Sequence, residues 1–488
     1  IITRSYEYDK STITKQIFSG AKWTSVSTLI VTVIQIIQFA LLGNIMTIAE
    51  FGLVGMLTTV TIFTQIVLDM GFGAALIQKE NISERQLSTL YWLNILTGIL
   101  LFIGLFFLSP FIADFYQRDE LVFLVRILAV MFLIAPVDQQ YQYMLQKDLK
   151  FNVLSKIEAG VTVLSVVLLL VLVFLMDPIV AYALSQVFLN SVKGIMFFAV
   201  YLKKWRPSFV FALGEVKEFF SFGAFQLASR LVNRLGANID MILIGRFLGA
   251  EALGIYNLAY QIITIPVLKI NPIVTRVAFP VFSKNQGDNQ TLREGFLNMT
   301  KLLALISFPL LIGLTTVSDL FVEVVFGEKW LQAVPVLNIL AIVGLLRVLM
   351  NPNGSVLLAK GRADLAFYWD SGIMLLYGLS LYAAVLTNDL TITAWTYAAI
   401  SLVNFFIGRW LLKYVIQLKL GEYFRTVGKP LALTLLMALL ALVLSVGSRH
   451  LLHGAMLQLA VSVGISGIFY GFLVGKFYRR AMRAQLGR

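Results

Sequence analysis

The sequence predicts an all-α polytopic membrane protein with about fourteen transmembrane helices, and three observations carry this prediction. Hydrophobic residues make up 59% of the chain and charged residues only 13%, and the mean hydropathy is +0.84, values outside the range of soluble domains. Apolar runs of membrane-spanning length recur along the whole sequence. Lysine and arginine collect in every second loop between these runs, as they do in multi-pass membrane proteins.

The chain opens on a polar segment, residues 1–19, which we expect to lie in the cytoplasm and at the membrane interface. The first apolar run has full length and lacks a small-residue cleavage site, so we expect it to remain as the first crossing. The fourth and tenth runs end in the polar sequences VDQQYQYML and MNPNGSVLL, which we expect to unwind. The predicted spans are 20–42, 51–77, 87–109, 120–138, 153–175, 178–201, 217–248, 252–282, 292–318, 332–357, 364–386, 391–412, 429–447 and 455–475.

Loop charges predict the orientation of these spans. Of the 39 Lys and Arg residues, those outside the spans fall almost entirely in the two tails and in alternate loops. The intervening loops contain only Arg118, Lys329 and Arg449. The positive-inside rule therefore places both termini in the cytoplasm, and an even number of crossings agrees with that assignment.

An internal repeat predicts the domain organisation. The sequence GNIMTIAEFGL at 43–53 aligns with GRFLGAEALGI at 245–255. Six predicted spans separate the two copies, so both run in the same direction, which predicts two parallel six-helix lobes. The resulting parts are the N-terminal segment 1–19, an N-lobe at 20–201, a cytoplasmic linker at 202–216, a C-lobe at 217–412, and an appendage of two spans with a basic cytoplasmic tail at 413–488.

The seventh span, residues 220–249, is the most unusual because it carries charges well inside its hydrophobic length. At about 100° per residue, its polar side chains share roughly half of the helix circumference. An Arg at the centre of a membrane helix costs at least about 2.5–3.5 kcal/mol on insertion scales, so two on one face indicate a water-filled cavity or an anionic partner. The alternative is that the arginines only pair with Asp240 and neighbouring carbonyls. The polar residues of this face are Gln226, Arg230, Asn233, Arg234, Asn238 and Asp240.

Other spans also carry polar and charged residues. The eighth contains Lys269 and Arg276 beside two prolines that we expect to kink it toward a cavity. In the second span, Asp69 lies in LDMGFGAALIQ and is either an ion-coupling carboxylate or a cap for neighbouring helix ends. The first span is polar but uncharged at the matching positions, which include Gln35 and Gln38. Two further in-span cations, Lys301 and Arg347, fit a cavity, packing or snorkelling equally well.

Several function classes have no support in the sequence. It contains no Walker motif, no Ser/His/Asp set and no acidic pair on an outer loop, so we predict no catalytic residues and a transporter instead of an enzyme. There is no cysteine, and the two histidines, His450 and His453, have no ligand-like neighbours, so we expect no metal and no bound cofactor. The net charge of +13 is spread between apolar segments, which fits membrane topology and not nucleic acid.

Two stretches carry a family resemblance that covers essentially the whole chain. They are LDMGFGAALIQ in the second span and SFGAFQLASRLVNRLGANIDMILIGRFLGAEALGIYNLAYQIITIPVLKINPIVTRVAFPVFSK across the seventh and eighth. With them, the chain resembles bacterial polysaccharide repeat-unit flippases, the Wzx-type or teichuronic and colanic acid exporter branch of the multidrug/oligosaccharidyl-lipid/polysaccharide superfamily. The resemblance implies a V-shaped pair of lobes around a chamber formed mainly by spans 1, 2, 7 and 8. It also implies alternating access at the bacterial inner membrane.

The resemblance further implies the substrate, an oligosaccharide on undecaprenyl diphosphate that moves from the cytoplasmic to the outer leaflet. Arg230, Arg234, Lys269 and Arg276 would then bind the diphosphate, since guanidinium groups give bidentate, permanently charged contacts. Sugar contacts would come from Gln35, Gln38, Gln226, Asn233 and Asn238. Asp69 and Asp240 are the carboxylates that would couple transport to a proton or sodium gradient.

The expected partners are this lipid-linked oligosaccharide, membrane lipids and the polysaccharide polymerase and export machinery, with no nucleic acid and a monomeric transporter. Two alternatives stay open. A lipid II flippase is also cationic inside and is not separated by charge alone. A drug or cation antiporter would need carboxylates in its chamber, whereas in-span cations here outnumber acids on the predicted lining helices.

Overall fold

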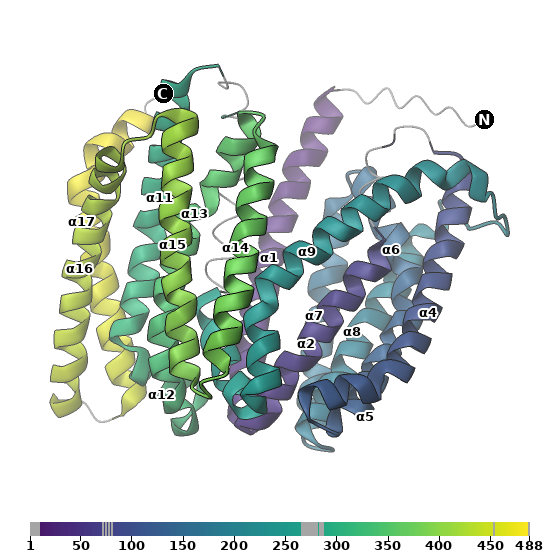
Figure 1. The fold of residues 1–488 in the computed structure, drawn as a ribbon, viewed down its shortest axis with the longest axis horizontal. Helices are drawn as coiled ribbons and strands as arrows, with labels where there is room; N and C mark the ends of the chain where they lie inside the picture. The colour runs from purple at the N-terminus through teal and green to yellow at the C-terminus, as the bar shows by residue number, and fades with distance from the viewer. Residues whose placement is uncertain are drawn as a thin grey trace. The chain divides into compact units, whose positions relative to one another are not determined.

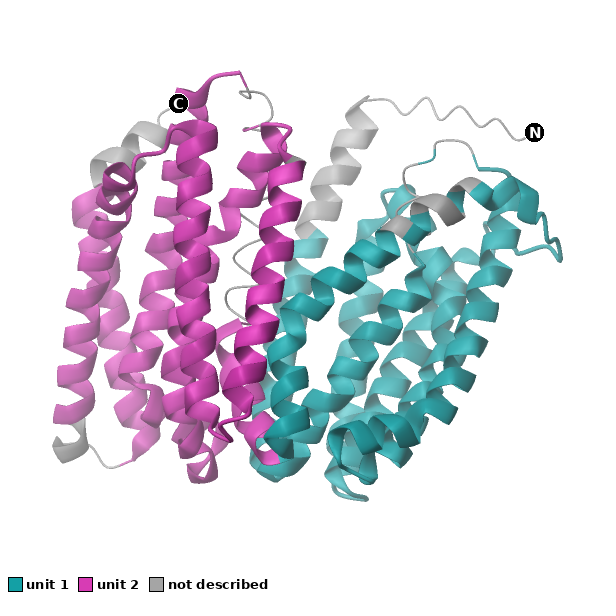
Figure 2. Cartoon of the chain, in the orientation of Figure 1, with its two compact units in different colours: residues 1–250 teal, residues 251–488 magenta. Residues whose placement is uncertain are grey.

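The structure, a computed structural model, describes residues 10–70, 73, 76, 79, 82–264, 282, 287–451 and 454–486. Within these residues all regular secondary structure is helical, which confirms the predicted all-α class (Figure 1). The chain divides into two compact units, residues 1–250 and 251–488 (Figure 2).

The described residues of unit 1 form eight α-helices and one 3-10 helix, before the helix that crosses into unit 2. In order these are α1 (Lys10–Ile45), α2 (Ile48–Asp69), α4 (Glu84–Tyr116), α5 (Glu120–Ala129), α6 (Met131–Lys147), α7 (Phe151–Val173), α8 (Pro178–Tyr201), η1 (Leu213–Val216) and α9 (Lys217–Phe247). Helix follows again over 249–264 and leads into unit 2. The remaining elements of unit 2 are α11 (Asn289–Thr316), α12 (Ser318–Phe326), η2 (Glu328–Ala333), α13 (Val334–Ala359), α14 (Ala363–Val385), α15 (Leu390–Ile416), α16 (Leu420–Leu451) and α17 (Ala455–Leu486).

Over its described residues each predicted span falls on helix, and the fourth is shared by α5 and α6. Eleven helical segments in the described part of the chain are long and apolar enough to cross a membrane. The helices α9 and α14 are not among them, and α9 is the more polar of the two. The protein is therefore a multi-pass membrane protein, and α9 is the helix whose charges already set it apart in the sequence.

Polar side chains fix several helix starts. Thr47 and Glu50 form a capping box at α2, and Ser83 and Gln86 form another at α4. Asp288 caps α11, where hydrogen bonds from the Thr291 hydroxyl and from the backbone N–H groups of the first turn lower the pKa of its carboxyl. These side chains satisfy amide groups that the helix itself leaves without acceptors.

The expectation that the fourth and tenth spans unwind at their inner ends is wrong. VDQQYQYML lies inside α6 and MNPNGSVLL lies inside α13, and both stay helical. Their polar side chains find partners within the protein: Gln140 donates to the Leu87 carbonyl at 2.8 Å, and Asn353 accepts from Arg409. The fourth span is instead divided nearer its middle, at Val130, into α5 and α6.

The packing units differ from the lobes expected from the repeat. In unit 1, α9 packs against α2, although its sequence placed it at the start of the C-lobe. The linker 202–216 also packs on unit 1, since the Ser208 amide donates to the Ser88 hydroxyl at 3.0 Å and the Trp92 indole donates to the Ser208 carbonyl at 2.9 Å. The lobe boundary at 202–216 therefore stays a prediction about the repeat, while the packing boundary lies at 250.

One close approach in unit 1 requires glycine. A Cβ added at Gly52 of α2 would overlap the carbonyl oxygen of Ala250, a backbone atom that cannot rotate away. These two residues belong to the two copies of the repeated sequence. The absence of a side chain at Gly52 thus lets the helices meet backbone to backbone.

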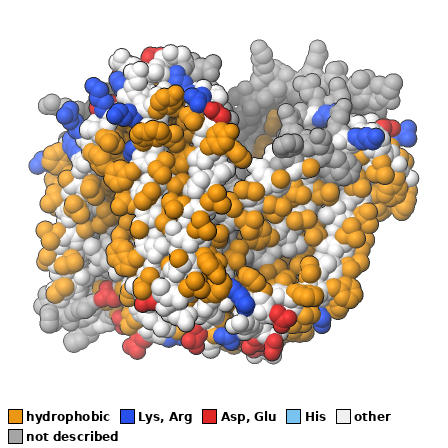
Figure 3. Space-filling model, in the orientation of Figure 1, with side chains coloured by type: hydrophobic (Ala, Val, Ile, Leu, Met, Phe, Trp, Pro, Cys, Tyr) orange, Lys and Arg blue, Asp and Glu red, His pale blue; other side chains and the backbone are white. Residues whose placement is uncertain are grey.

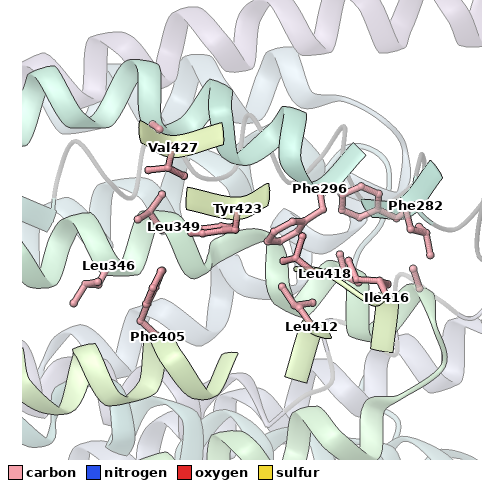
Figure 4. Close-up of a cluster of buried hydrophobic side chains, with 14 of the residues drawn as sticks. Phe282, Phe296, Leu346, Leu349, Phe405, Leu412, Ile416, Leu418, Tyr423 and Val427 are labelled. Carbon is pink, nitrogen blue, oxygen red and sulfur yellow. The ribbon is translucent and has the colours of Figure 1, made fainter. Parts of the chain in front are cut away.

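Unit 2 has a core in which one cation is enclosed. Buried Phe296, Phe405 and Tyr423 lie together with leucine and isoleucine side chains (Figure 4). Arg409 is 1% exposed, and the centre of its guanidinium lies 4.4–5.2 Å from these three ring centroids. It donates to the Asn353 side chain, and no ion pair neutralises it among the described residues. Cation–π attraction therefore takes the place of a carboxylate.

Candidate functional site

A cavity of about 330 Å³ lies within unit 1 and is lined from four helices, α2, α6, α8 and α9. Polar residues spaced four apart place side chains on one face of three of these helices. The spacing occurs at Gln65 and Asp69 on α2, at Asp138 and Gln142 on α6, and at Arg230 and Arg234 on α9. The polar residues that line the cavity are Gln65, Asp69, Asp138, Gln139, Gln142, Tyr143, Asn190, Lys193, Arg230 and Arg234.

The Asp69 carboxylate is the centre of the hydrogen bonds in this cavity. It is 6% exposed at the last residue of α2. Oδ1 accepts hydrogen bonds from the Tyr143 hydroxyl and, at 3.3 Å, from the Gln139 side chain, and Oδ2 forms an ion pair with Arg230. A buried carboxylate needs such donors to offset its lost hydration. Asp69 therefore holds α2, α6 and α9 together.

Gly73, in the LDMGFG motif, makes room for this arrangement. A Cβ at Gly73 would overlap the ring of Tyr143, whose hydroxyl binds Asp69. The glycine of the motif thus has a packing role at the cavity.

The two arginines of α9 differ in their surroundings. The Arg230 side chain is 43% exposed and is paired with Asp69. Arg234 is exposed, lines the cavity, and has no hydrogen bond or ion pair from its guanidinium among the described residues. Neither arginine contacts Asp240, which is 2% exposed and does not line the cavity. The acidic partner of Arg230 is therefore Asp69 and not Asp240.

A second group of charges in the cavity was missed from the sequence. Asp138 on α6 is 5% exposed, and Lys193 on α8 interacts electrostatically with it and with Glu158 of α7. Glu158 also accepts a hydrogen bond from Gln142 at 3.3 Å. The available signal was the four-residue spacing of Asp138 and Gln142, which marks one face of an intact helix, whereas we interpreted the polar sequence as unwound.

Other predicted residues lie elsewhere. Gln35 and Asn233 are exposed, and Gln38, Gln226 and Asn238 are half-buried, but none of these lines the cavity. The Asn238 side chain donates to the Arg234 carbonyl within α9 at 2.8 Å. Lys269 and Arg276 lie outside the described residues.

The cavity combines three cations, Lys193, Arg230 and Arg234, with two acids, Asp69 and Asp138. Asp69 engages one of the cations directly, and Arg234 remains available to an anion. Among the described residues no three acidic or histidine side chains gather as a metal site would require. The arrangement can bind an anionic group through Arg234. The same anionic group can replace Asp69 as the partner of Arg230.

Comparison with known proteins gives consistent matches. The sequence model of the family described as polysaccharide biosynthesis protein matches residues 41–335. Teichuronic acid biosynthesis protein TuaB of Bacillus subtilis (strain 168) is 70% identical over 96% of this chain and 96% of that protein. Lipopolysaccharide biosynthesis protein WzxC of Escherichia coli (strain K12) is 36% identical over 72% of this chain and 71% of that protein.

The fold also matches a solved structure. Lipid II flippase MurJ, in an inward closed conformation, is similar with a TM-score of 0.75 over 94% of this chain and 99% of that chain. The sequence identity in this match is 13%, so it shows a common all-helical transporter fold and nothing about the substrate.

Proposed function

Because the chain belongs to the polysaccharide biosynthesis protein family, we propose that it moves an oligosaccharide attached to undecaprenyl diphosphate across the bacterial inner membrane, from the cytoplasmic to the outer leaflet. The relatives TuaB and WzxC carry names that connect them with envelope polysaccharides. Movement would occur by alternating access, without a chemical step on the sugar. The chain would act as a secondary transporter.

The observation that carries this proposal is the Arg234 guanidinium, which faces the unit 1 cavity without a partner among the described residues. A diphosphate supplies the paired oxygens that a guanidinium binds in a bidentate manner. Such a contact is charge-assisted and is therefore stronger than a hydrogen bond between neutral groups. We therefore assign the first contact with the diphosphate to Arg234.

Arg230 would join in a second step. Its pairing with Asp69 keeps the cation in place while the cavity is empty, and an incoming diphosphate competes with that carboxylate. A proton arriving on Asp69 would weaken the pair and release Arg230 to the substrate. We propose Asp69 as the coupling carboxylate on this basis, since Asp240 does not line the cavity. The roles predicted for Lys269 and Arg276 in drawing in the diphosphate remain part of the proposal.

The test is transport by the purified protein in vesicles with a labelled undecaprenyl-diphosphate oligosaccharide. Appearance of the glycan in the opposite leaflet would be measured by its accessibility to an added glycosidase. Arg234→Gln should slow the initial rate about tenfold, which corresponds to about 1.4 kcal/mol of lost charge-assisted binding. Arg234→Glu should abolish transport, because it places a like charge against the diphosphate.

Arg246→Gln is the matched control, since Arg246 is on the same helix but does not line the cavity. A correctly folded Arg234→Glu variant that transports at the wild-type rate contradicts the proposal. Lipid II, offered as a second substrate in the same vesicles, separates the two flippase alternatives. A pH gradient should accelerate the wild type and leave Asp69→Asn unchanged, and acceleration of both would remove Asp69 from the coupling step.

A further inference from the structure

A second cavity, of about 450 Å³, lies within unit 2 between α11, α16 and α17, far along the chain from the charges of α9. Its size is in the range of small-molecule sites. Three cations line it, Lys301, Arg425 and Lys429, against one acid, Glu294. The full set of lining residues is Glu294, Leu297, Asn298, Lys301, Arg425, Thr426, Lys429 and Tyr478.

In the residues that the structure describes, no acid is paired with any of the three cations of this cavity. None forms an ion pair in the described part of the chain, and Glu294 accepts instead from the neighbouring Gln290 side chain at 3.1 Å. Like charges held close to one another repel, and the repulsion disappears when an anion lies between them. The arrangement therefore has the electrostatics of an anion site.

The aromatic ring of Tyr478 contacts two of these cations. The Lys301 ammonium lies 4.7 Å from its ring centroid and the Lys429 ammonium 4.9 Å, so the same ring attracts one lysine from α11 and one from α16. The Tyr478 ring packs with Leu433 and Leu473. Its hydroxyl is buried, so the face of the ring and not the hydroxyl serves the cavity.

The three helices are fixed against one another at this place. The Tyr470 hydroxyl of α17 donates to the Leu305 carbonyl of α11 at 2.8 Å, and α16 packs on both helices. The cavity is thus built by packed elements and does not depend on two flexible side chains meeting by chance.

Position along the helices points to the membrane surface. Arg425 and Lys429 lie in the first turns of α16, and Tyr478 lies in the last third of α17 (Ala455–Leu486). The visible face of unit 2 has its Lys and Arg gathered mainly at the end where the C-terminus lies, and its Asp and Glu mainly at the other end (Figure 3). Directly beyond Lys301, α11 exposes Leu302 and Ile306 at 50% and 40%. A charged cavity that borders exposed apolar surface suits a molecule with an anionic head and a hydrocarbon chain.

We propose that this cavity binds the phosphate of an anionic membrane phospholipid. Lys301, Arg425 and Lys429 hold the phosphodiester, and the acyl chains lie along the apolar surface of α11. Basic pockets between transmembrane helices recognise anionic headgroups in this way. The bound lipid would hold α16 and α17 to α11. This inference does not rest on the proposed transport function.

The experiment uses the full-length protein in detergent, titrated with tail-labelled phosphatidylglycerol and, separately, phosphatidylcholine. Each of Lys301→Gln, Arg425→Gln and Lys429→Gln should weaken phosphatidylglycerol binding about fivefold, and the triple variant should reduce it to the level of phosphatidylcholine. Lys413→Gln is the control of equal charge, because Lys413 lies in the last turn of α15 and does not line the cavity.

Thermal unfolding supplies a second readout. Phosphatidylglycerol should raise the unfolding midpoint of the wild type and of Lys413→Gln, and should leave the triple variant unchanged. Without lipid, the triple variant should unfold close to the wild-type midpoint, since the repulsion that it removes is offset by the loss of two cation–π contacts with Tyr478. Equal loss of binding in Lys413→Gln and in the cavity variants overturns the proposal. Displacement of phosphatidylglycerol by millimolar inorganic phosphate overturns it as well, because it would identify a free-anion site.

Discussion

At the scale of residues, the carboxylate of Asp69 depends on a tyrosine hydroxyl that reaches it from another helix. We expect Tyr143→Phe to lower the free energy of unfolding by about 1.5–3 kcal/mol, the range for a hydrogen bond to a charged group. Denaturant titration of the purified protein in detergent measures this. Gly73→Ala should reproduce part of the loss, because its Cβ would push the Tyr143 ring away from Asp69.

Tyr368→Phe is the control for this pair, since Tyr368 is 72% exposed and its hydroxyl has no hydrogen bond among the described residues. Equal stability of Tyr143→Phe and the control would mean that the hydroxyl contributes nothing to Asp69. A loss in Gly73→Ala alone would indicate strain in the helix without a role for the hydroxyl.

Residue identity alone found part of this site. Arg230 and Arg234 could be predicted because their spacing and their cost in a membrane are local properties of one helix. The partner of Arg230 could not be predicted, because Asp69 lies on another helix and its position depends on how α2 and α9 pack. Asp138 was missed for a related reason. Whether a polar stretch unwinds or stays helical depends on partners such as the Leu87 carbonyl, which lie far away in the chain.

At the scale of elements, the contact between α2 and the start of the helix at 249–264 rests on Gly52. We expect Gly52→Ala to destabilise the protein by about 1–3 kcal/mol, because the added methyl group meets a backbone carbonyl. The unfolding midpoint in detergent measures the loss. Gly104→Ala is the matched control, since Gly104 is inside α4 and a Cβ there meets nothing within 4 Å. It should leave stability unchanged or raise it by up to about 1 kcal/mol.

An unfolding midpoint of Gly52→Ala equal to that of Gly104→Ala would show that the two helices can separate without loss of stability.

The positions of the helices could be predicted from the sequence, because hydropathy over about twenty residues determines whether a segment can span a bilayer. The division at Val130 could not, since residues on both sides of it have the same apolar pattern. Hydropathy reports burial in lipid and does not report where a helix axis changes direction.

At the scale of the whole molecule, the orientation predicted from loop charges can be tested directly, because the chain contains no cysteine. Single cysteines can therefore be introduced without background. Asp119→Cys and Glu328→Cys should react with a membrane-impermeant maleimide in intact cells. Arg206→Cys and Lys419→Cys should react only after permeabilisation, because the positive-inside rule places them in the cytoplasm. The reverse pattern would invert the orientation, and labelling at all four sites would point to mixed insertion.

The packing of unit 2 shows that the last two helices are not merely an addition to the repeat. The repeat left α16 and α17 as an appendage, yet Tyr423 and Val427 of α16 belong to the buried cluster of unit 2 (Figure 4). The repeat describes how the sequence is organised, whereas burial describes what the folded chain needs. A sequence comparison within the chain has no access to the second property.

Arg409 has a consequence for how the protein is made. A guanidinium keeps its proton, so α15 carries a fixed charge into the bilayer when it leaves the ribosome. One of the rings that encloses this charge, Tyr423, is on α16 and is synthesised later. Until α16 is synthesised, Phe296, Phe405 and Asn353 cover this cation only in part. Biogenesis of unit 2 is thus complete only when its C-terminal part has closed over that charge.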